Sequence, residues 1–144
     1  NSGKAPLGFK KTDLAASAVT SGPGLRSFSY VGLPDGSGTI LDATAVGDYV
    51  VFTLNVPVPG IYDVKVCYKQ YTARGIMQSA VNNTNIGAPV DEFLATGEGY
   101  AQSDLGNLNF SSAGNYQVKF TVVGKNAGST GYAISFDTIT LTPQ

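Results

Sequence analysis

The sequence predicts an all-β domain, and three observations carry this prediction. Glycine occurs 18 times in 144 residues, which suits many tight turns because glycine adopts turn dihedral angles at no steric cost. Hydrophobic residues make up 42% of the chain, and the abundant β-branched and aromatic side chains among them favour pleated strands. Several segments alternate hydrophobic and polar residues with the period of a half-buried strand. The length is typical of one domain with one core.

The first third of the chain is its least regular part. We interpret residues 1–12 as an N-terminal extension or tether and place the β-sandwich at residues 13–144. Residues 13–19 are compatible with an opening strand or one helical turn, and residues 27–31 predict a short strand. Residues 34–38 (PDGSG) form a turn by composition.

Clear alternation begins at residue 49. Residues 49–56 and 61–69 predict two strands, each with one hydrophobic and one polar face, and Lys69 falls on a polar face. The inward side chains are Val50, Phe52, Leu54 and Val56 in the first strand and Tyr62, Val64, Val66 and Tyr68 in the second. Residues 57–60 (PVPG) predict a turn, because proline fixes φ and glycine permits the reversal. We expect the two strands to form a hairpin.

The second half of the chain predicts further strands. Residues 75–81 predict a strand that ends at residues 82–85 (NNTN), whose amides tolerate turn and left-handed conformations. Shorter extended segments fall at residues 92–94, 100–105 and 108–110, and a regular strand at residues 115–123. Residues 132–141 predict the last strand, whose change of inward phase indicates a β-bulge. Nine or ten such strands predict two antiparallel sheets packed face to face.

The composition excludes several classes of function. Nine basic and ten acidic residues give a net charge of −1, which leaves no broad basic surface for nucleic acid. Histidine is absent and Cys67 is the single cysteine, which excludes Ser-His-Asp and Cys-His catalysis, zinc sites with histidine and an internal disulfide. No run approaches the roughly 18–20 apolar residues that cross a bilayer, so we expect no membrane association. The first residue is Asn1, and we expect a mature or excised part of a longer, exported protein.

Four acidic residues in the middle of the chain are the candidates for hydrolytic catalysis: Asp91, Glu92, Glu98 and Asp104. Glycoside hydrolysis needs two carboxylates about 5–9.5 Å apart on one wall of a cleft. These residues lie among loop signals without an evident motif, so we interpret them as solvated loop acids. Tyr71 and Arg74 could supply the base and the neutralising charge of a lyase, but such pairs are common. We expect no enzymatic activity.

Several segments taken together resemble the β-sandwich carbohydrate-binding modules of families 6 and 35. They are residues 45–69 (AVGDYVVFTLNVPVPGIYDVKVCYK), Arg74, and residues 104–110 (DLGNLNF), 111–120 (SSAGNYQVKF) and 131–141 (GYAISFDTITL). The resemblance covers roughly residues 13–143 and implies a jelly-roll sandwich of two antiparallel sheets that binds a glycan without catalysis. Such modules are appended to secreted bacterial polysaccharide-degrading enzymes. It therefore implies an extracellular location, a polysaccharide or oligosaccharide ligand and a catalytic domain in the parent chain, and we expect a monomer.

The resemblance also implies a sugar site in the loops at one end of the sandwich. Carried over one position at a time, the aromatic rings of this site fall on Tyr71 and Tyr100 and its amide on Asn126, with Arg74 beside them. Aromatic faces stack on the C–H side of a pyranose, while amide and guanidinium groups bind hydroxyls. Each of these residues could instead have a purely structural role. Tyr71 could cover the sandwich end, Tyr100 pack on a strand, Arg74 brace a loop, and Asn126 serve a turn.

The chain departs from the family pattern in two respects. Tryptophan, which family members usually carry in this site, is absent, so tyrosine must stack with less contact area. Family members also hold a structural calcium ion between glutamates of an opening segment and an aspartate that matches Asp137. The opening segment here is residues 10–13 (KKTD), with lysine and threonine at the glutamate positions. We therefore expect no calcium, keep Asp13 and Asp137 as candidate metal ligands, and expect no other cofactor.

Two further functions remain open at this stage. The first is a structural or adhesive β-sandwich spacer domain without a sugar site. The second is a small polysaccharide-active enzyme. Binding to a broad panel of glycans separates the binding module from the spacer, and release of product from a polysaccharide identifies the enzyme. The identity of the glycan depends on loop shape, which no motif in this sequence specifies.

Overall fold

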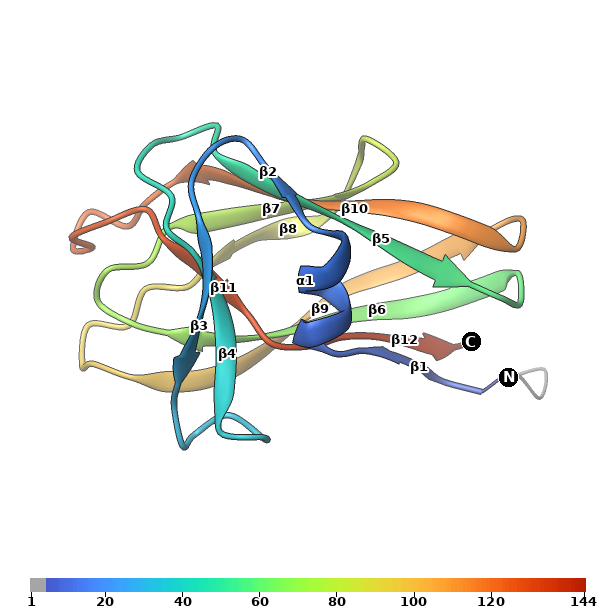
Figure 1. The fold of residues 1–144 in the computed structure, drawn as a ribbon, viewed down its shortest axis with the longest axis horizontal. Helices are drawn as coiled ribbons and strands as arrows, with labels where there is room; N and C mark the ends of the chain where they lie inside the picture. Colours follow the sequence, from blue (N-terminus) through green and yellow to red (C-terminus); the bar gives the residue numbers. More distant parts are fainter. Residues whose placement is uncertain (1–4) are drawn as a thin grey trace.

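The computed structural model describes residues 5–144, which form an antiparallel β-sandwich (Figure 1). Its elements are β1 (Leu7–Phe9), α1 (Lys11–Ser17), β2 (Val19–Thr20), β3 (Leu25–Ser29), β4 (Ser37–Leu41), β5 (Tyr49–Val56), β6 (Gly60–Gln70), β7 (Ile76–Val81), β8 (Thr84–Asp91), β9 (Gly99–Phe110), β10 (Gly114–Gly124), β11 (Ile134–Phe136) and β12 (Ile139–Pro143). One sheet has the strand order β1-β12-β6-β9 and the other β2-β5-β10-β7-β8, with a small third sheet of order β11-β4-β3. The predicted all-β class with antiparallel sheets is confirmed.

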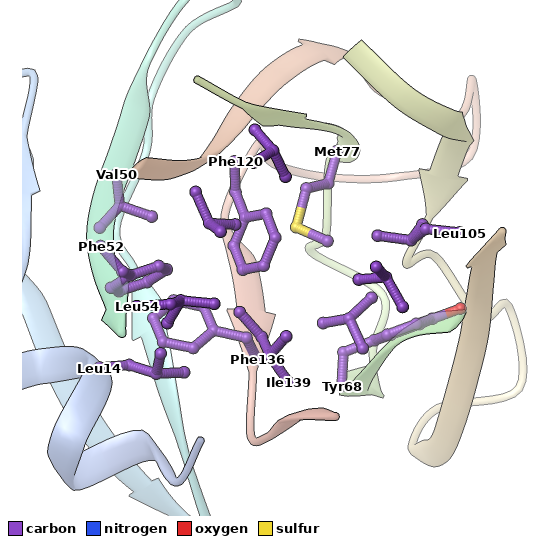
Figure 2. Packing of buried hydrophobic residues seen from close by; sticks show 14 of the residues in the cluster. Leu14, Val50, Phe52, Leu54, Tyr68, Met77, Leu105, Phe120, Phe136 and Ile139 are labelled. Atoms are coloured by element: carbon purple, nitrogen blue, oxygen red, sulfur yellow. The ribbon is translucent and has the colours of Figure 1, made fainter. Parts of the chain in front are cut away.

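The hydrophobic core lies between the two larger sheets (Figure 2). The predicted inward faces of β5 and β6 are buried, because alternate residues of a strand point to the same side. The ring centroid of Phe52 lies 5.6 Å from that of Phe120 and 4.9 Å from that of Phe136, in edge-to-face pairs. Such pairs add about 0.5–1.5 kcal/mol each to the effect of the buried area. The core therefore joins the sheets through side chains distant in sequence.

The predicted hairpin of β5 and β6 is wrong, because these strands belong to different sheets. β5 pairs with β10 and β2, whereas β6 pairs with β12 and β9. The connection contains Pro57 and Pro59, which lack the N–H group that a hydrogen-bonded ladder needs. Each strand has one hydrophobic face, and strands on opposite sides of the core can pack these faces against each other. The connection thus crosses from one sheet to the other.

The predicted last strand, residues 132–141, is divided in two. β11 pairs with β4 in the small sheet, whereas β12 pairs with β6. Between them, the Asp137 N–H donates to the Cys67 carbonyl (2.8 Å), and the Cys67 N–H donates to the Thr138 carbonyl (3.0 Å). The phase change that indicated a β-bulge is therefore the passage of the chain between sheets.

Other elements differ from expectation in their extent. β4 and β8 were not expected as strands, and residues 100–105 and 108–110 belong to one strand, β9, with a register shift near Gly106. Gly106 has a φ of 92°, which glycine adopts without strain. The turn expected at residues 82–85 is confirmed for Asn82 and Asn83, which connect β7 to β8 with φ values of 48° and 66°, whereas Thr84 and Asn85 already belong to β8.

The N-terminal part of the described chain contributes to the sandwich. β1 pairs with β12, with Leu7 opposite Leu141 and Phe9 opposite Ile139, so part of the predicted extension lies in the sheet. Residues 1–4 of that extension lie outside the described residues. The helical alternative for residues 13–19 is confirmed in α1, which buries Leu14 against the core. With seven residues in α1, residues 5–144 contain no helix long and apolar enough to span a membrane.

Candidate functional site

A cavity of about 200 Å³ lies beside the C-terminal end of β6. It is lined by Arg26, Phe28, Ser29, Ile40, Lys69, Tyr71, Arg74 and Glu98. The antiparallel register pairs Arg26 with Ile40 and Phe28 with Gly38, so Arg26, Phe28 and Ile40 share one face of the small sheet. A Cβ atom at Gly38 would lie 2.8 Å from the Phe28 ring, so glycine makes room for that ring.

Lys69 is 8% exposed, although it falls on the predicted polar, outward face of β6. Its ammonium nitrogen lies 5.4 Å from the ring centroid of Phe28, 4.7 Å from that of Tyr30 and 4.6 Å from that of Tyr71. The small sheet covers β6 here, so a position that alternation assigns to solvent becomes buried. The negative ring faces attract the ammonium group and offset part of its lost hydration. The ion pair with Glu98 spans 3.6 Å.

Arg74 is 4% exposed and shares the ring of Tyr71 with Lys69. Its guanidinium carbon lies 5.3 Å from the ring centroid of Tyr71 and 5.8 Å from that of Phe28. Its Nε atom is buried and has no hydrogen-bond partner in the described part of the chain. Burial lowers the pKa of Arg74, but a guanidinium group stays charged at neutral pH.

The segment that carries Tyr71 and Arg74 is held in place from two sides. The Tyr71 N–H donates to the Glu92 carbonyl (3.0 Å), and the Gly75 N–H donates to the Ala133 carbonyl (2.8 Å). The Ser129 hydroxyl donates to the Arg74 carbonyl at 2.7 Å. Backbone groups fixed in this way lose little further conformational entropy when a ligand binds. The two lining side chains therefore start from a preorganised backbone.

Glu92 corrects the interpretation of the central acids as solvated loop residues, because it is 0% exposed. Its Oε1 atom accepts hydrogen bonds from the Ser135 N–H (2.7 Å) and the Ser135 hydroxyl (3.2 Å). Burial raises the pKa of Glu92 from 4.5 to about 8, against the opposing effects of Ser135 and the positive charge of Arg74. Glu92 is therefore mostly protonated at neutral pH. The other three acids of this group are exposed.

The structure brings Tyr71 and Arg74 together in the cavity but places Tyr100 at its side. Tyr100 lies opposite Lys69 in the β6–β9 register, so the two side chains project from the same face of the sheet. The Tyr100 side chain is 41% exposed, and its hydroxyl donates to Cys67 Sγ at 3.3 Å. This hydrogen bond and burial raise the pKa of Tyr100 to about 12. Tyr100 thus extends the surface next to the cavity without lining it.

Asn126 uses both ends of its amide group within the protein. Its Nδ2 atom donates to Asp91 Oδ2 at 3.1 Å, and its Oδ1 atom accepts from the Gly128 N–H at 2.9 Å. The side chain thereby connects the loop of residues 125–131 to the end of β8. Asn126 does not belong to the lining of the cavity. Its contact with a ligand stays a prediction.

The candidate metal ligands do not fit a calcium ion. Asp13 is exposed on α1, and within residues 5–144 no three Asp, Glu or Cys side chains gather in a group that could hold a metal ion. Both carboxylate oxygens of Asp137 are buried without a hydrogen bond, but Oδ1 lies 3.6 Å from the ammonium nitrogen of Lys11. Lys11 also forms a hydrogen-bonded ion pair with Asp35. An ammonium group already lies beside these carboxylates, whereas calcium requires six to eight oxygen ligands.

Six lining or adjacent residues were missed in the sequence: Arg26, Phe28, Ser29, Tyr30, Ile40 and Lys69. The alternation of Arg26, Phe28 and Tyr30 indicates that they share a face of one strand. No sequence pattern shows that this face meets the end of β6, because that contact depends on the small sheet.

A second cavity of about 200 Å³ lies between α1 and β3. Its lining, which includes Ala15, Leu25 and Thr39, contains no aromatic ring. A ring face is the group that stacks on a sugar. The cavity beside β6 is therefore the better candidate for a glycan site.

Several proteins of known structure have folds similar to that of this chain. No family model matches the sequence, and no curated protein matches it. A Paenibacillus xanthan lyase structure aligns with 95% of this chain at 30% identity and a TM-score of 0.86, but the chain spans only 13% of that protein.

Two isolated modules align over nearly their whole length. The family 35 carbohydrate-binding module from Clostridium thermocellum has 17% identity and a TM-score of 0.64, with 98% of this chain and 100% of the module covered. The C-terminal family 6 module of a laminarinase from Zobellia galactanivorans has 16% identity and a TM-score of 0.62, with 96% and 99% covered. A family 36 module matches at 13% identity and a TM-score of 0.64. The chain therefore has the β-sandwich fold of the carbohydrate-binding modules of families 6, 35 and 36.

Proposed function

We propose that this domain binds a glycan through the cavity beside β6 and performs no catalysis. One observation carries the proposal: a preorganised cavity joins an aromatic ring, Tyr71, to the buried cations Lys69 and Arg74 on a fold used by carbohydrate-binding modules. Binding sites for small molecules combine apolar and aromatic walls with a few fixed polar groups. At about 200 Å³, the cavity is smaller than the roughly 300–1,000 Å³ of drug-sized sites. It suits one sugar residue or a chain end.

The contacts follow from the positions of the rings and cations. Lys69 and Arg74 donate N–H groups to oxygen atoms of the sugar, and Tyr71 positions both cations through its ring. Tyr100, exposed beside the cavity, offers a ring face for the neighbouring sugar residue. We propose that Asn126 supports the adjacent loop, since both ends of its amide are already bonded.

The acids of the cavity support a binding role over hydrolysis. Glu98 is the one carboxylate among the lining residues of the described chain, whereas glycoside hydrolysis normally uses two. We further propose that the domain is a monomeric module in a longer extracellular enzyme. The small share of the xanthan lyase chain that it spans is consistent with such a module. A module of this kind keeps its parent enzyme close to the polymer and so raises the local concentration.

Affinity electrophoresis against xanthan, mannan, laminarin, xylan and β-1,3-galactan tests the binding. We expect retarded migration on at least one polysaccharide and an affinity at least about tenfold lower in Tyr71→Ala, because a central aromatic residue carries much of the binding energy. The matched control is Tyr49→Ala, since Tyr49 also stacks with a lysine, Lys119 (4.3 Å), but in the other sheet. It should bind like the wild type. No binding across the panel would support the spacer function, and release of sugar products would support an enzyme.

A further inference from the structure

The cavity beside β6 carries an excess of positive charge. Arg26, Lys69 and Arg74 line it together with one carboxylate, Glu98. The whole chain has a net charge of −1, so this excess is a local feature of the cavity.

The two buried cations of the cavity are weakly neutralised by the protein. The Glu98 side chain that pairs with Lys69 at 3.6 Å is 47% exposed, and exposed ion pairs contribute little to stability. Arg74 forms no ion pair among the described residues. The nearby Glu92 has a pKa of about 8 and therefore carries little negative charge at neutral pH. Burying a charge is costly unless an opposite charge or hydrogen bonds compensate it.

The ring contacts of Arg74 leave its hydrogen-bond donors free. Tyr71 and Phe28 lie near the guanidinium group at 5.3 and 5.8 Å, but an aromatic ring offers neither the lone pairs nor the negative charge of a carboxylate acceptor. The Nε atom is buried and has no acceptor in the described chain. An unsatisfied buried donor costs free energy. The unpartnered donor, on a side chain that lines the cavity, points to an acceptor supplied by a ligand.

We propose that this cavity binds an anionic substituent of the glycan, a carboxylate or a sulfate group, through Arg74 and Lys69. The inference rests on the proposed function and names the chemical class of its ligand. A planar guanidinium binds such oxyanions with paired, charge-assisted hydrogen bonds, which are about twice as strong as neutral ones. A neutral hydroxyl could accept one hydrogen bond but would leave Arg74 without an opposite charge and Lys69 with only the exposed Glu98. Arg26 is exposed at the rim, where Asp42 pairs with its Nε atom at 2.8 Å, and its remaining N–H groups can bind the same anionic group at short range.

Matched acidic and neutral polysaccharides test the inference by isothermal titration calorimetry. The pairs are xanthan and carboxyl-reduced xanthan, polygalacturonate and its carboxyl-reduced form, and dextran sulfate and dextran. We expect at least one acidic member to bind on the order of tenfold or more tightly than its neutral partner, the effect of one charge-assisted hydrogen bond. Preference for the carboxylate pairs or for dextran sulfate identifies the anionic group. Equal binding within every pair overturns the inference and leaves the proposed function standing, as does binding only to neutral glycans of the wider panel. Binding to no glycan overturns both.

Variants that remove a positive charge test whether the preference for acidic polysaccharides arises in this cavity. Lys69→Met and Arg26→Gln should each reduce the preference for the acidic polysaccharide, and the exposed Arg26 can be replaced without disturbing the fold. The matched control is Lys119→Gln, which removes a lysine stacked on a tyrosine in the other sheet. Circular dichroism confirms that each variant is folded. An acidic preference that survives both cavity substitutions, or that falls equally in the control, would refute the assignment to this cavity.

Discussion

Glu92 and Arg74 show how burial changes the chemistry of individual residues in this protein. Glu92 is fully buried, and its pKa of about 8 means that it is mostly neutral at pH 7. Arg74 beside it keeps its charge but has a buried Nε atom without an acceptor among the described residues. Glu92 therefore contributes little negative charge to balance the positive charge of Arg74. The alternation of residues along a strand does not predict the burial of Glu92 or Arg74, because it indicates the direction of a side chain and not which other residues cover it.

The raised pKa of Glu92 predicts a specific dependence of stability on pH. Folding favours the protonated form of Glu92. The contribution of Glu92 to the free energy of unfolding is therefore fully present below pH 4.5 and is lost as the pH rises towards about 8. We expect the free energy of unfolding to fall through this range with a slope of up to about 1.4 kcal/mol per pH unit. Glu92→Gln should flatten the slope in urea denaturation curves measured at several pH values. Glu98→Gln, at an exposed position, should retain it; an unchanged slope in Glu92→Gln would contradict the assignment.

At the level of elements, local signals determined the turns and distant contacts determined the pairing. Asn82 and Asn83 form a two-residue turn between β7 and β8 with positive φ at both positions, which asparagine tolerates. The turn was evident in the sequence. The partners of β5 and β6 were not, because a hydrophobic face fits equally against a sheet on either side of a connection. Only the register with β10 and β9 decides between a hairpin and a crossing.

The Asn82–Asn83 turn gives a test at this scale. Asn83→Val should lower the free energy of unfolding by about 1–3 kcal/mol, because a β-branched residue is strained at a φ of 66°. Asn85→Val is the matched control, since Asn85 is an exposed position inside β8 where valine is well suited. Thermal and chemical denaturation measure both changes. Equal stability of Asn83→Val and the wild type would show that this turn is not held in the left-handed conformation.

For the whole molecule, a lysine ammonium stands beside the carboxylate that a structural metal would use. Lys11 at the start of α1 lies 3.6 Å from the buried Asp137, which follows β11, and also pairs with Asp35 after β3. Burial and the neighbouring Asp35 raise the pKa of Asp137, and Lys11 opposes this shift. This contact connects three distant parts of the chain. We therefore predict that Lys11 takes the place that a structural cation would have beside Asp137.

The Lys11 contact predicts a domain whose stability is independent of calcium. A chelator should leave the melting temperature unchanged and added calcium should not raise it, because an ion that binds the folded state would stabilise that state. Lys11→Met should lower the free energy of unfolding by on the order of 3 kcal/mol, since it leaves Asp137 buried without a cation. Calcium should not restore this loss, and Lys10→Met at an exposed neighbouring position is the control. A lower melting temperature of the wild type in chelator would refute the prediction.

The sequence by itself determined the all-β class, most strand positions, and the inward faces of β5, β6 and β10. These follow from local rules, because alternation has a period of two residues and glycine, proline and asparagine mark turns. Two residues that line the cavity, Tyr71 and Arg74, were expected from the resemblance to carbohydrate-binding modules and not from these rules. Only the tertiary structure decided the sheet of each strand, the burial of Lys69 and Glu92, and the Lys11 contact with Asp137. Those features arise where strands distant in sequence meet. The alternation of residues within one strand does not indicate which other strand covers it.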